Sequence, residues 1–159
     1  MSARLAVVVV ALACVQLSAQ GVVAQKNLSL GLAKTIAEAA QSECKAKGFN
    51  TSVAVVDRAG QVLVILRDEQ ATPQTAEMAR RKAYTARMFR ISTADFEKRT
   101  ENPGYAAQRD LTDILALSGG VPIQIGTDTI GGVGSAGSTL EMDDACARAG
   151  LAKAKDELR

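Results

Sequence analysis

Two β-rich runs joined by a four-residue turn constrain the fold of this chain more than any other feature of its sequence. Residues 52–56 read SVAVV and residues 61–67 read QVLVILR. Between them stands DRAG, 57–60, with the aspartate-first, glycine-last pattern of a tight turn. Strands separated by so short a turn pair in opposite directions, so the sequence predicts an antiparallel hairpin.

Helical patterns come before and after this hairpin. The range 28–47 has apolar residues at helical spacing and stops at Gly48. A second helix is predicted over 72–89, with Thr72 as its N-cap and Pro73 as its first helical residue. Ser92 caps a short helix that ends near residue 99, and part of 106–117 is expected to be helical.

The last forty residues are predicted to add a second pair of strands and a final helix. Residues 119–122, GGVP, are expected to form a loop, followed by strands over 123–125 and 129–135. Ser138 begins STLE, a capping box that opens a helix running towards Leu158. The predicted fold is therefore α+β, an antiparallel sheet of about five strands flanked by helices.

The N-terminal segment has the pattern of a cleaved signal peptide. Arg4 precedes an apolar run over 5–17, which is shorter than the roughly 20 residues that span a bilayer. Small residues at Val22–Ala24 predict cleavage after Ala24. An uncleaved anchor and a lipoprotein acylated at Cys14 are the alternatives. Cleavage leaves 25–159 as a single domain that is periplasmic or secreted and has no membrane segment.

Composition excludes several classes of function. The chain has no histidine, which rules out Ser-His-Asp and Cys-His catalysis and histidine metal sites. Few aromatic residues and a nearly balanced charge argue against a nucleic-acid partner. Two cysteines remain after cleavage, Cys44 and Cys146, too few for a structural zinc site. They form either a disulfide or two separate buried thiols.

The range 72–90 combines four alanines with five cationic side chains. The four alanines share one helical face, and Arg80 and Arg87 border it with Tyr84 between them. One interpretation is a packing helix whose arginines are solvated or lie at a subunit interface. The other is that Arg80, Tyr84 or Arg87 binds a carboxylate-bearing ligand, because the arginine fork matches a carboxylate.

Two further motifs have both a structural and a functional interpretation. Gly132, Gly134 and Gly137 have G-x-G-x-x-G spacing before a capped helix, as in a phosphate site, or they let another backbone approach closely. Asp143 and Asp144 lie at the start of the last helix, where they favour its dipole. A carboxylate metal site there lacks an evident third ligand, so no metal site is predicted.

Taken in order, these segments resemble the GlcG/HbpS family of haem-binding proteins. The resemblance rests on SVAVVDRAGQVLVILRDEQA, ARRKAYTARMFR, GGVPI, GGVGSAG and DDACARAGLAK, which together span most of 28–155. It implies an antiparallel α/β domain with helices around its sheet, assembled as a homo-oligomer of four to eight copies. It also implies haem as the leading ligand and cofactor.

Two positions depart from the family pattern. Many relatives have Pro-His-Thr where this chain has Pro73-Gln74-Thr75, and Ala136 replaces a usual serine in the glycine strand. The first departure removes the most obvious nitrogen ligand of haem iron.

We therefore expect an exported small-ligand-binding protein whose ligand is haem or another planar, anionic molecule. Its pocket is predicted between the Pro73 helix, the 119–122 loop and the 131–137 strand. Its ligand-binding residues are Gln74, Arg80, Lys82, Tyr84, Arg87, Gly120, Pro122 and Gly134. The alternatives are a small-metabolite enzyme that uses Lys82 with nearby carboxylates, and a ligand-free oligomeric structural module. No catalytic residue is assigned.

Overall fold

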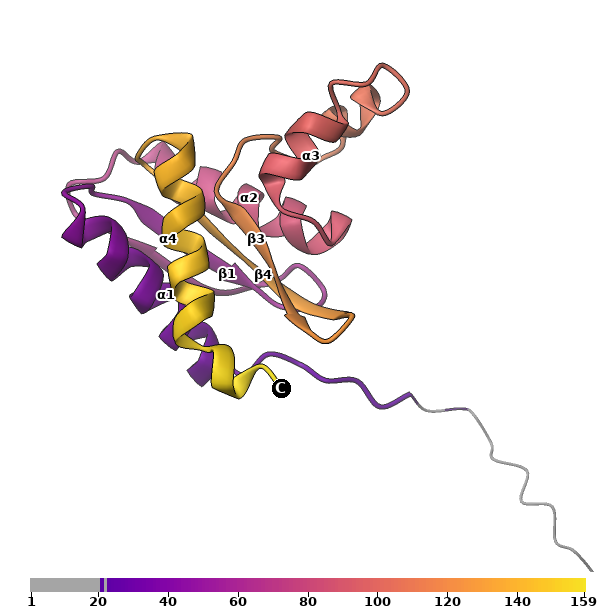
Figure 1. Cartoon of the computed structure of the whole chain (residues 1–159), viewed down its shortest axis with the longest axis horizontal. Coiled ribbons are helices and arrows are strands. Elements are labelled where there is room, and N and C mark those ends of the chain that lie inside the picture. Colours follow the sequence, from indigo (N-terminus) through magenta and orange to yellow (C-terminus); the bar gives the residue numbers. More distant parts are fainter. Residues whose placement is uncertain (1–20, 22) are drawn as a thin grey trace, which may run out of the picture.

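The computed structural model describes residue 21 and residues 23–159. Figure 1 shows its helices α1 (Leu30–Ala46), α2 (Gln74–Phe89), α3 (Thr93–Arg99) and α4 (Leu140–Lys153). The strands are β1 (Ser52–Val56), β2 (Val62–Arg67), β3 (Gly120–Ile125) and β4 (Asp128–Ala136), and short 3-10 helices occupy Ala106–Asp110 and Lys155–Glu157. The predicted signal peptide, 1–24, lies almost wholly outside the described residues, so its cleavage stays a prediction.

The described strands form one antiparallel sheet in the order β2-β1-β4-β3. The predicted hairpin is present, with Ser52 opposite Arg67 and Val53 opposite Leu66. Strand β4 then pairs with β1 on one side and with β3 on the other. The α+β class is confirmed, but the sheet has four strands in the described part of the chain where about five were predicted. After β4 the chain passes directly into α4, which covers a face of the sheet instead of extending it.

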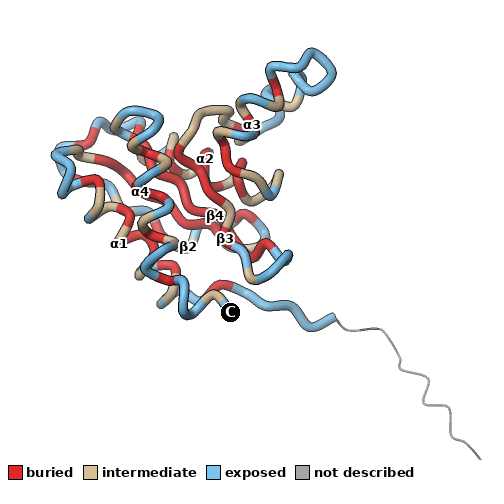
Figure 2. Tube along the Cα trace, in the orientation of Figure 1, coloured by how far each residue is buried: buried red, intermediate tan, exposed pale blue. Residues whose placement is uncertain are grey.

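The two faces of the sheet are covered differently. Helices α1 and α4 pack side by side on one face, and α2 alone crosses the other (Figure 1). The central strands β1 and β4 are almost wholly buried between these layers, whereas the edge strands β2 and β3 are partly exposed (Figure 2). The cluster on the α1 and α4 side contains large aliphatic side chains such as Ile36, Ile123 and Val133. The cluster beneath α2 is built mainly from alanines: Ala54, Val56, Ala79, Ala83 and Ala136.

Small residues bring α2 close to the backbone of β4. Ala79, Ala83 and Ala86 are fully buried, which confirms the predicted alanine face. A Cβ atom added to Gly134 would overlap the Ala79 carbonyl oxygen and lie 2.6 Å from the Ala83 nitrogen. Contacts below 3.0 Å do not occur for real Cβ atoms. The glycines of β4 therefore serve close backbone approach, one of the two interpretations of this motif.

Three predicted boundaries are wrong. The segment 119–122 is no loop, because β3 begins at Gly120 and continues through Pro122 as an edge strand. Pro73, and not Thr72, stands at the N-cap of α2, and it makes no side-chain capping bond. Thr139, and not Ser138, caps α4 through a bond from the Met142 nitrogen. The Ser138 hydroxyl instead donates to Asp143 at 2.6 Å.

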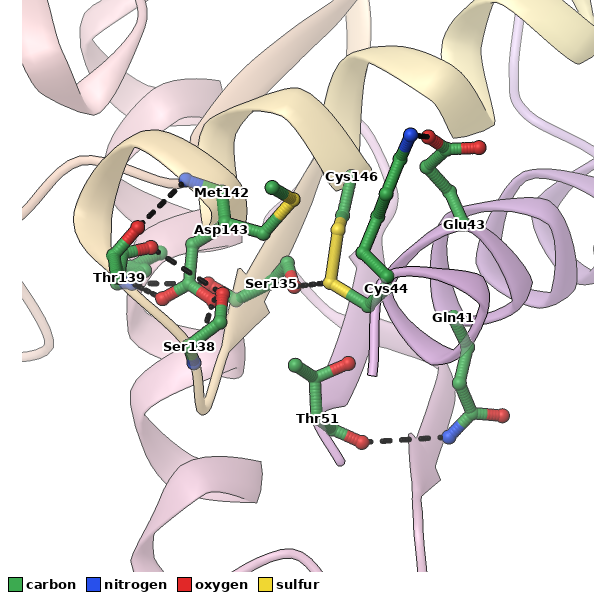
Figure 3. Close-up of a disulfide and its surroundings, with 12 residues drawn as sticks. Gln41, Glu43, Cys44, Thr51, Ser135, Ser138, Thr139, Met142, Asp143 and Cys146 are labelled. Atoms are coloured by element: carbon green, nitrogen blue, oxygen red, sulfur yellow. Dashed lines mark hydrogen bonds and ion pairs between the residues drawn. A yellow bond between two sulfur atoms is a disulfide. The ribbon is translucent and has the colours of Figure 1, made fainter. Parts of the chain in front are cut away.

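A disulfide joins α1 to α4 on the same face of the sheet (Figure 3). Cys44 and Cys146 are both fully buried, and their Cα atoms are 5.6 Å apart. The two cysteines are 102 residues apart in sequence, so the bond connects the first helix to the last one. Of the two arrangements that the sequence left open, a disulfide or two separate thiols, the fold has the disulfide.

The close approach of α2 to β4 makes Gly134→Ala a sensitive test of the fold. The added methyl group forces α2 away from the sheet, so the free energy of unfolding should fall by at least about 1–3 kcal/mol. The matched control is Gly31→Ala at an exposed position of α1, where a Cβ atom meets only the Ser29 hydroxyl at 3.9 Å. That change should leave stability unchanged or raise it by about 0.5–1 kcal/mol. Urea unfolding measures both, and equal effects would contradict the packing described.

Candidate functional site

A groove opens between the start of α3, the edge strand β3 and the C-terminal half of α4. Its volume is about 560 Å³, within the roughly 300–1,000 Å³ typical of small-molecule pockets. Residues from three separated parts of the chain line it: Ile91, Ser92, Asp95, Val121, Pro122, Gln124, Arg148, Leu151, Ala152, Lys155 and Leu158.

The floor of the groove is apolar. Val121 is 5% exposed, and Leu151 and Leu158 pack against the main core beside it. Pro122 follows Val121 on β3, where an edge strand tolerates the missing backbone N–H. Pro122 therefore presents no N–H group of its own to a molecule that lies against β3.

The α3 wall carries a self-contained polar pair. The Ser92 hydroxyl accepts a hydrogen bond from the Asp95 nitrogen at 3.1 Å and donates to the Asp95 carboxylate at 2.6 Å. This is the N-cap of α3, as predicted for Ser92. The Asp95 carboxylate on this wall therefore already accepts a hydrogen bond, from the Ser92 hydroxyl.

The opposite wall carries two cationic side chains, Arg148 and Lys155. Arg148 donates from Nε to Asp144 at 2.6 Å, but its side chain is 55% exposed. Such exposed pairs contribute little, so the guanidinium can exchange its partner for a ligand at small cost. Lys155 is exposed just beyond the end of α4. The sequence interpretation missed both residues, although their seven-residue spacing places them on one face of the helix that was predicted to run towards Leu158.

Lys82, a predicted ligand contact, lies inside the protein. It is fully buried, and its Nζ donates to Asp143 Oδ2 at 2.7 Å and to the Ser135 carbonyl at 2.9 Å. The other Asp143 oxygen accepts from the nitrogen and hydroxyl of Ser138 (Figure 3). Burial lowers the pKa of Lys82, and the neighbouring Asp143 carboxylate opposes that shift.

This buried ion pair connects α2 to the first turn of α4. Lys82 therefore belongs to the packing of the fold and does not line the groove. The alternative enzymatic interpretation requires a lysine amine that a substrate can reach, and the Lys82 amine is buried. The pair also gives Asp143 a structural partner, and no group of three potential metal ligands occurs among the described residues.

Of the other predicted residues of α2, three are partly buried and one is exposed. Arg80 donates to Glu77 and Asp113, and these carboxylates, Glu77 most strongly, raise its pKa. Tyr84 packs over Gly60 in the hairpin turn. Arg87 is half-buried, and Gln74 is exposed at the first position of the helix.

Where a pocket was predicted, between α2, residues 119–122 and the glycine strand, the backbones of these segments are in close contact. Gly134 contacts the backbone of Ala79 and Ala83, and Gly120 lies against the Lys82 carbonyl. Helix α2 thus fills the space in which a ligand was expected. Of the eight predicted residues, Pro122 lines the groove, and Gly120 lies two residues before it in β3.

Comparison with known proteins places the chain in a family. Residues 28–152 match the model of the family described as haem degrading protein HbpS-like. The chain belongs to the HbpS-like family. This confirms the resemblance drawn from its sequence motifs.

Individual relatives support the assignment. Protein GlcG of Escherichia coli K12 is 33% identical over 107 residues, which cover 67% of this chain and 79% of GlcG. The crystal structure of HbpS superposes with a TM-score of 0.80 at 36% identity and covers 83% of this chain and 93% of that one. A double mutant of Streptomyces reticuli HbpS gives the same TM-score at 33% identity and covers 94% and 97% of the two chains.

The buried pair predicts a large effect for Lys82→Ala. This change leaves the Asp143 carboxylate buried without its cation, so the free energy of unfolding should fall by about 3–5 kcal/mol. Lys98→Ala, which removes an exposed lysine of α3, is the control and should have almost no effect. Urea unfolding followed by circular dichroism compares the two. Equal stability of the two variants would show that the pair is not buried in solution.

Proposed function

We propose that this protein binds haem, or a similar planar and anionic molecule, in the groove between α3, β3 and α4. The observation that carries the proposal is the combination of an apolar floor with Arg148 and Lys155 on one rim. Membership of the HbpS-like family, described as haem degrading, makes haem the first ligand to test.

The groove offers contacts to the ring face and the propionates of haem, but no strong ligand for its iron. Val121, Pro122 and Leu151 offer apolar contact to a ring face, and Arg148 and Lys155 offer charge to two propionates. Among the lining residues, the side chains with oxygen atoms are Ser92, Asp95 and Gln124; none has a sulfur atom or an imidazole. Haem would therefore be held through its propionates and its apolar face, without a strong axial ligand from the groove.

We also propose that the protein works outside the cytoplasm. The buried Cys44–Cys146 disulfide favours an oxidising compartment. The apolar run over 5–17 supplies a route of export. Among the described residues, no helix has the length and apolar character needed to cross a bilayer. The homo-oligomer of four to eight copies stays a prediction of the family resemblance.

Titration with ferric haem tests the binding site. We expect weak binding with a high-spin spectrum and an affinity that falls with salt, because the propionate contacts are screened. Arg148→Gln and Lys155→Gln should each weaken binding by about two- to fivefold, the range of partly exposed ion pairs. Lys153→Gln, which removes an exposed lysine of the same helix outside the groove, is the matched control. The haem affinity of the wild type and of the three variants is measured from the Soret absorbance.

Gln74→His separates the groove from the site first predicted on α2. The substitution restores the family's usual residue, but Gln74 lies at the start of α2 and does not line the groove. The groove proposal therefore expects no change in the Soret maximum of this variant. A shifted maximum with tighter binding, combined with no effect of Arg148→Gln, would move the haem site to α2.

Export predicts a defined N-terminus. Protein collected from outside the cytoplasm should begin at Gln25, with Cys44 and Cys146 unreactive to thiol reagents until it is reduced and unfolded. Mass spectrometry before and after reduction and alkylation measures both features. Recovery of intact Met1, or of a lipid on Cys14, would contradict this part of the proposal.

A further inference from the structure

Strand β3 has a partner strand on one side only. It is the last strand of the sheet, and among the described strands only β4 pairs with it. The groove runs along this strand, because Val121, Pro122 and Gln124 all line it. In an antiparallel pair, alternate residues direct their main-chain N–H and C=O groups at the partner, and the residues between them direct theirs away.

A contact at Gly120 shows which residues of β3 face away from β4. The Gly120 N–H donates to the hydroxyl of Thr93, the first residue of α3, at 2.8 Å. The main chain of Gly120 therefore points out of the sheet edge. By alternation, the main-chain groups of Pro122 and Gln124 point the same way.

The irregularity in this ladder does not change the alternation along β3. Ile123 lies opposite Gly131 and Gln124 lies opposite Thr129, so the extra residue, Ile130, belongs to β4. A bulge of this kind disturbs the strand that contains the extra residue and leaves the spacing of its partner intact. Gln124 therefore keeps its outward orientation.

The outward side of β3 thus offers main-chain groups to the groove. Pro122 has a carbonyl but no N–H, and Gln124 has both. Within the described part of the chain, no backbone outside the sheet supplies a partner for them. An extended chain can add to such an edge as a further strand. Whether it runs parallel or antiparallel to β3, it must accept the Gln124 N–H.

The two walls of the groove flank this edge on opposite faces of the sheet. Val121 belongs to the core cluster beneath α1 and α4, which places α4 on that face. A Cβ atom added to Gly120 would overlap the Lys82 carbonyl of α2 and the Thr93 methyl group of α3, which places the start of α3 on the other face. Figure 1 shows β3 with α4 and α3 to either side.

Side chains of an added strand would alternate between these walls. Successive side chains of a strand point to opposite faces of the sheet. Every second one would therefore meet Arg148 and Lys155 of the α4 wall, which favour acidic groups. The intervening ones would meet Ile91 and Asp95 of the α3 wall, where an apolar side chain fits and an acidic one is repelled.

We infer that the groove also binds an extended peptide, which pairs with β3 and has acidic side chains at alternate positions. Its main chain accepts the Gln124 N–H, and its acidic side chains pair with Arg148 and Lys155. The inference shares the groove of the proposed function but does not depend on haem, because it rests on main-chain groups of β3 and on the alternation of the two walls.

Fluorescence anisotropy of a labelled peptide tests this inference. The probe is Glu-Val-Glu-Val-Glu with both ends blocked, and it should bind saturably with an affinity that falls with salt. Glu-Glu-Val-Val-Glu has the same composition and charge without the alternation, so it should bind about two- to fivefold more weakly. Lys-Val-Lys-Val-Lys reverses the charge and should show no saturable binding.

Two substitutions at one position separate main-chain from side-chain contacts. Gln124→Pro removes the outward N–H and no bond to β4, and it should weaken peptide binding about tenfold or more. Gln124→Ala keeps the N–H and should bind within about twofold of the wild type. Circular dichroism checks that both variants fold. Arg148→Gln and Lys155→Gln should each weaken binding about two- to fivefold, with Lys153→Gln as the control outside the groove.

Methylated peptides test strand pairing on the unmodified protein, so the inference stays falsifiable even where Gln124→Pro does not fold. An added strand directs alternate N–H groups at β3. Methylation of one alternate set of peptide nitrogens should therefore abolish binding, and methylation of the other set should preserve it.

Three results would overturn the inference. They are no saturable binding of the alternating peptide, equal affinity for the alternating and rearranged peptides, and equal affinity for the two methylated sets. Haem is titrated separately. Haem binding without peptide binding overturns this inference alone, and peptide binding without haem binding overturns the proposed function alone.

Discussion

The close approach of α2 to β4 determines the rest of the architecture. Gly132 and Gly134 have no Cβ atoms, and the facing residues of α2 are alanines, so two backbones meet almost directly. A layer this thin cannot hold a ligand. Concave space is found instead at the sheet edge, where β3 is flanked by α3 and α4 without being covered.

The opposite face of the sheet depends on larger side chains and on covalent closure. Ile36 and Ile123 fill the space beneath α1 and α4, and the disulfide fixes these helices to each other. The buried Lys82–Asp143 pair connects α2 to α4 near the same end of the molecule. One helix therefore takes part in the core, in the ion pair, in the disulfide and in the cationic wall of the groove.

The elements with local signals could be predicted from the sequence. The hairpin at 52–67, the alanine face of α2 and the Ser92 cap all depend on residues close together in the chain, and all three are present. The extent of β3 was misjudged, because Gly120 and Pro122 are typical of loops and the sequence does not reveal that this strand lies at an edge.

The site was harder to predict because its geometry is non-local. Lysine is usually exposed, so Lys82 was interpreted as a ligand contact, whereas Asp143, 61 residues further on, holds it inside. The groove combines residues near 91, 122 and 150, and no local pattern brings these ranges together. The seven-residue spacing of Arg148 and Lys155 could have indicated a shared cationic face. The sequence analysis instead considered Asp143 and Asp144, at the start of the same helix.

The Cys44–Cys146 bond closes a covalent ring that contains the whole sheet together with α2 and α3. The segment around 101–112 lies within this ring, is largely exposed, and extends with α3 away from the sheet (Figure 1). A protease that cuts the chain there produces two fragments that remain one molecule until the disulfide is reduced. Outside the cell, where proteases are common and thiols are oxidised, such a nick would leave both helices on their face of the sheet.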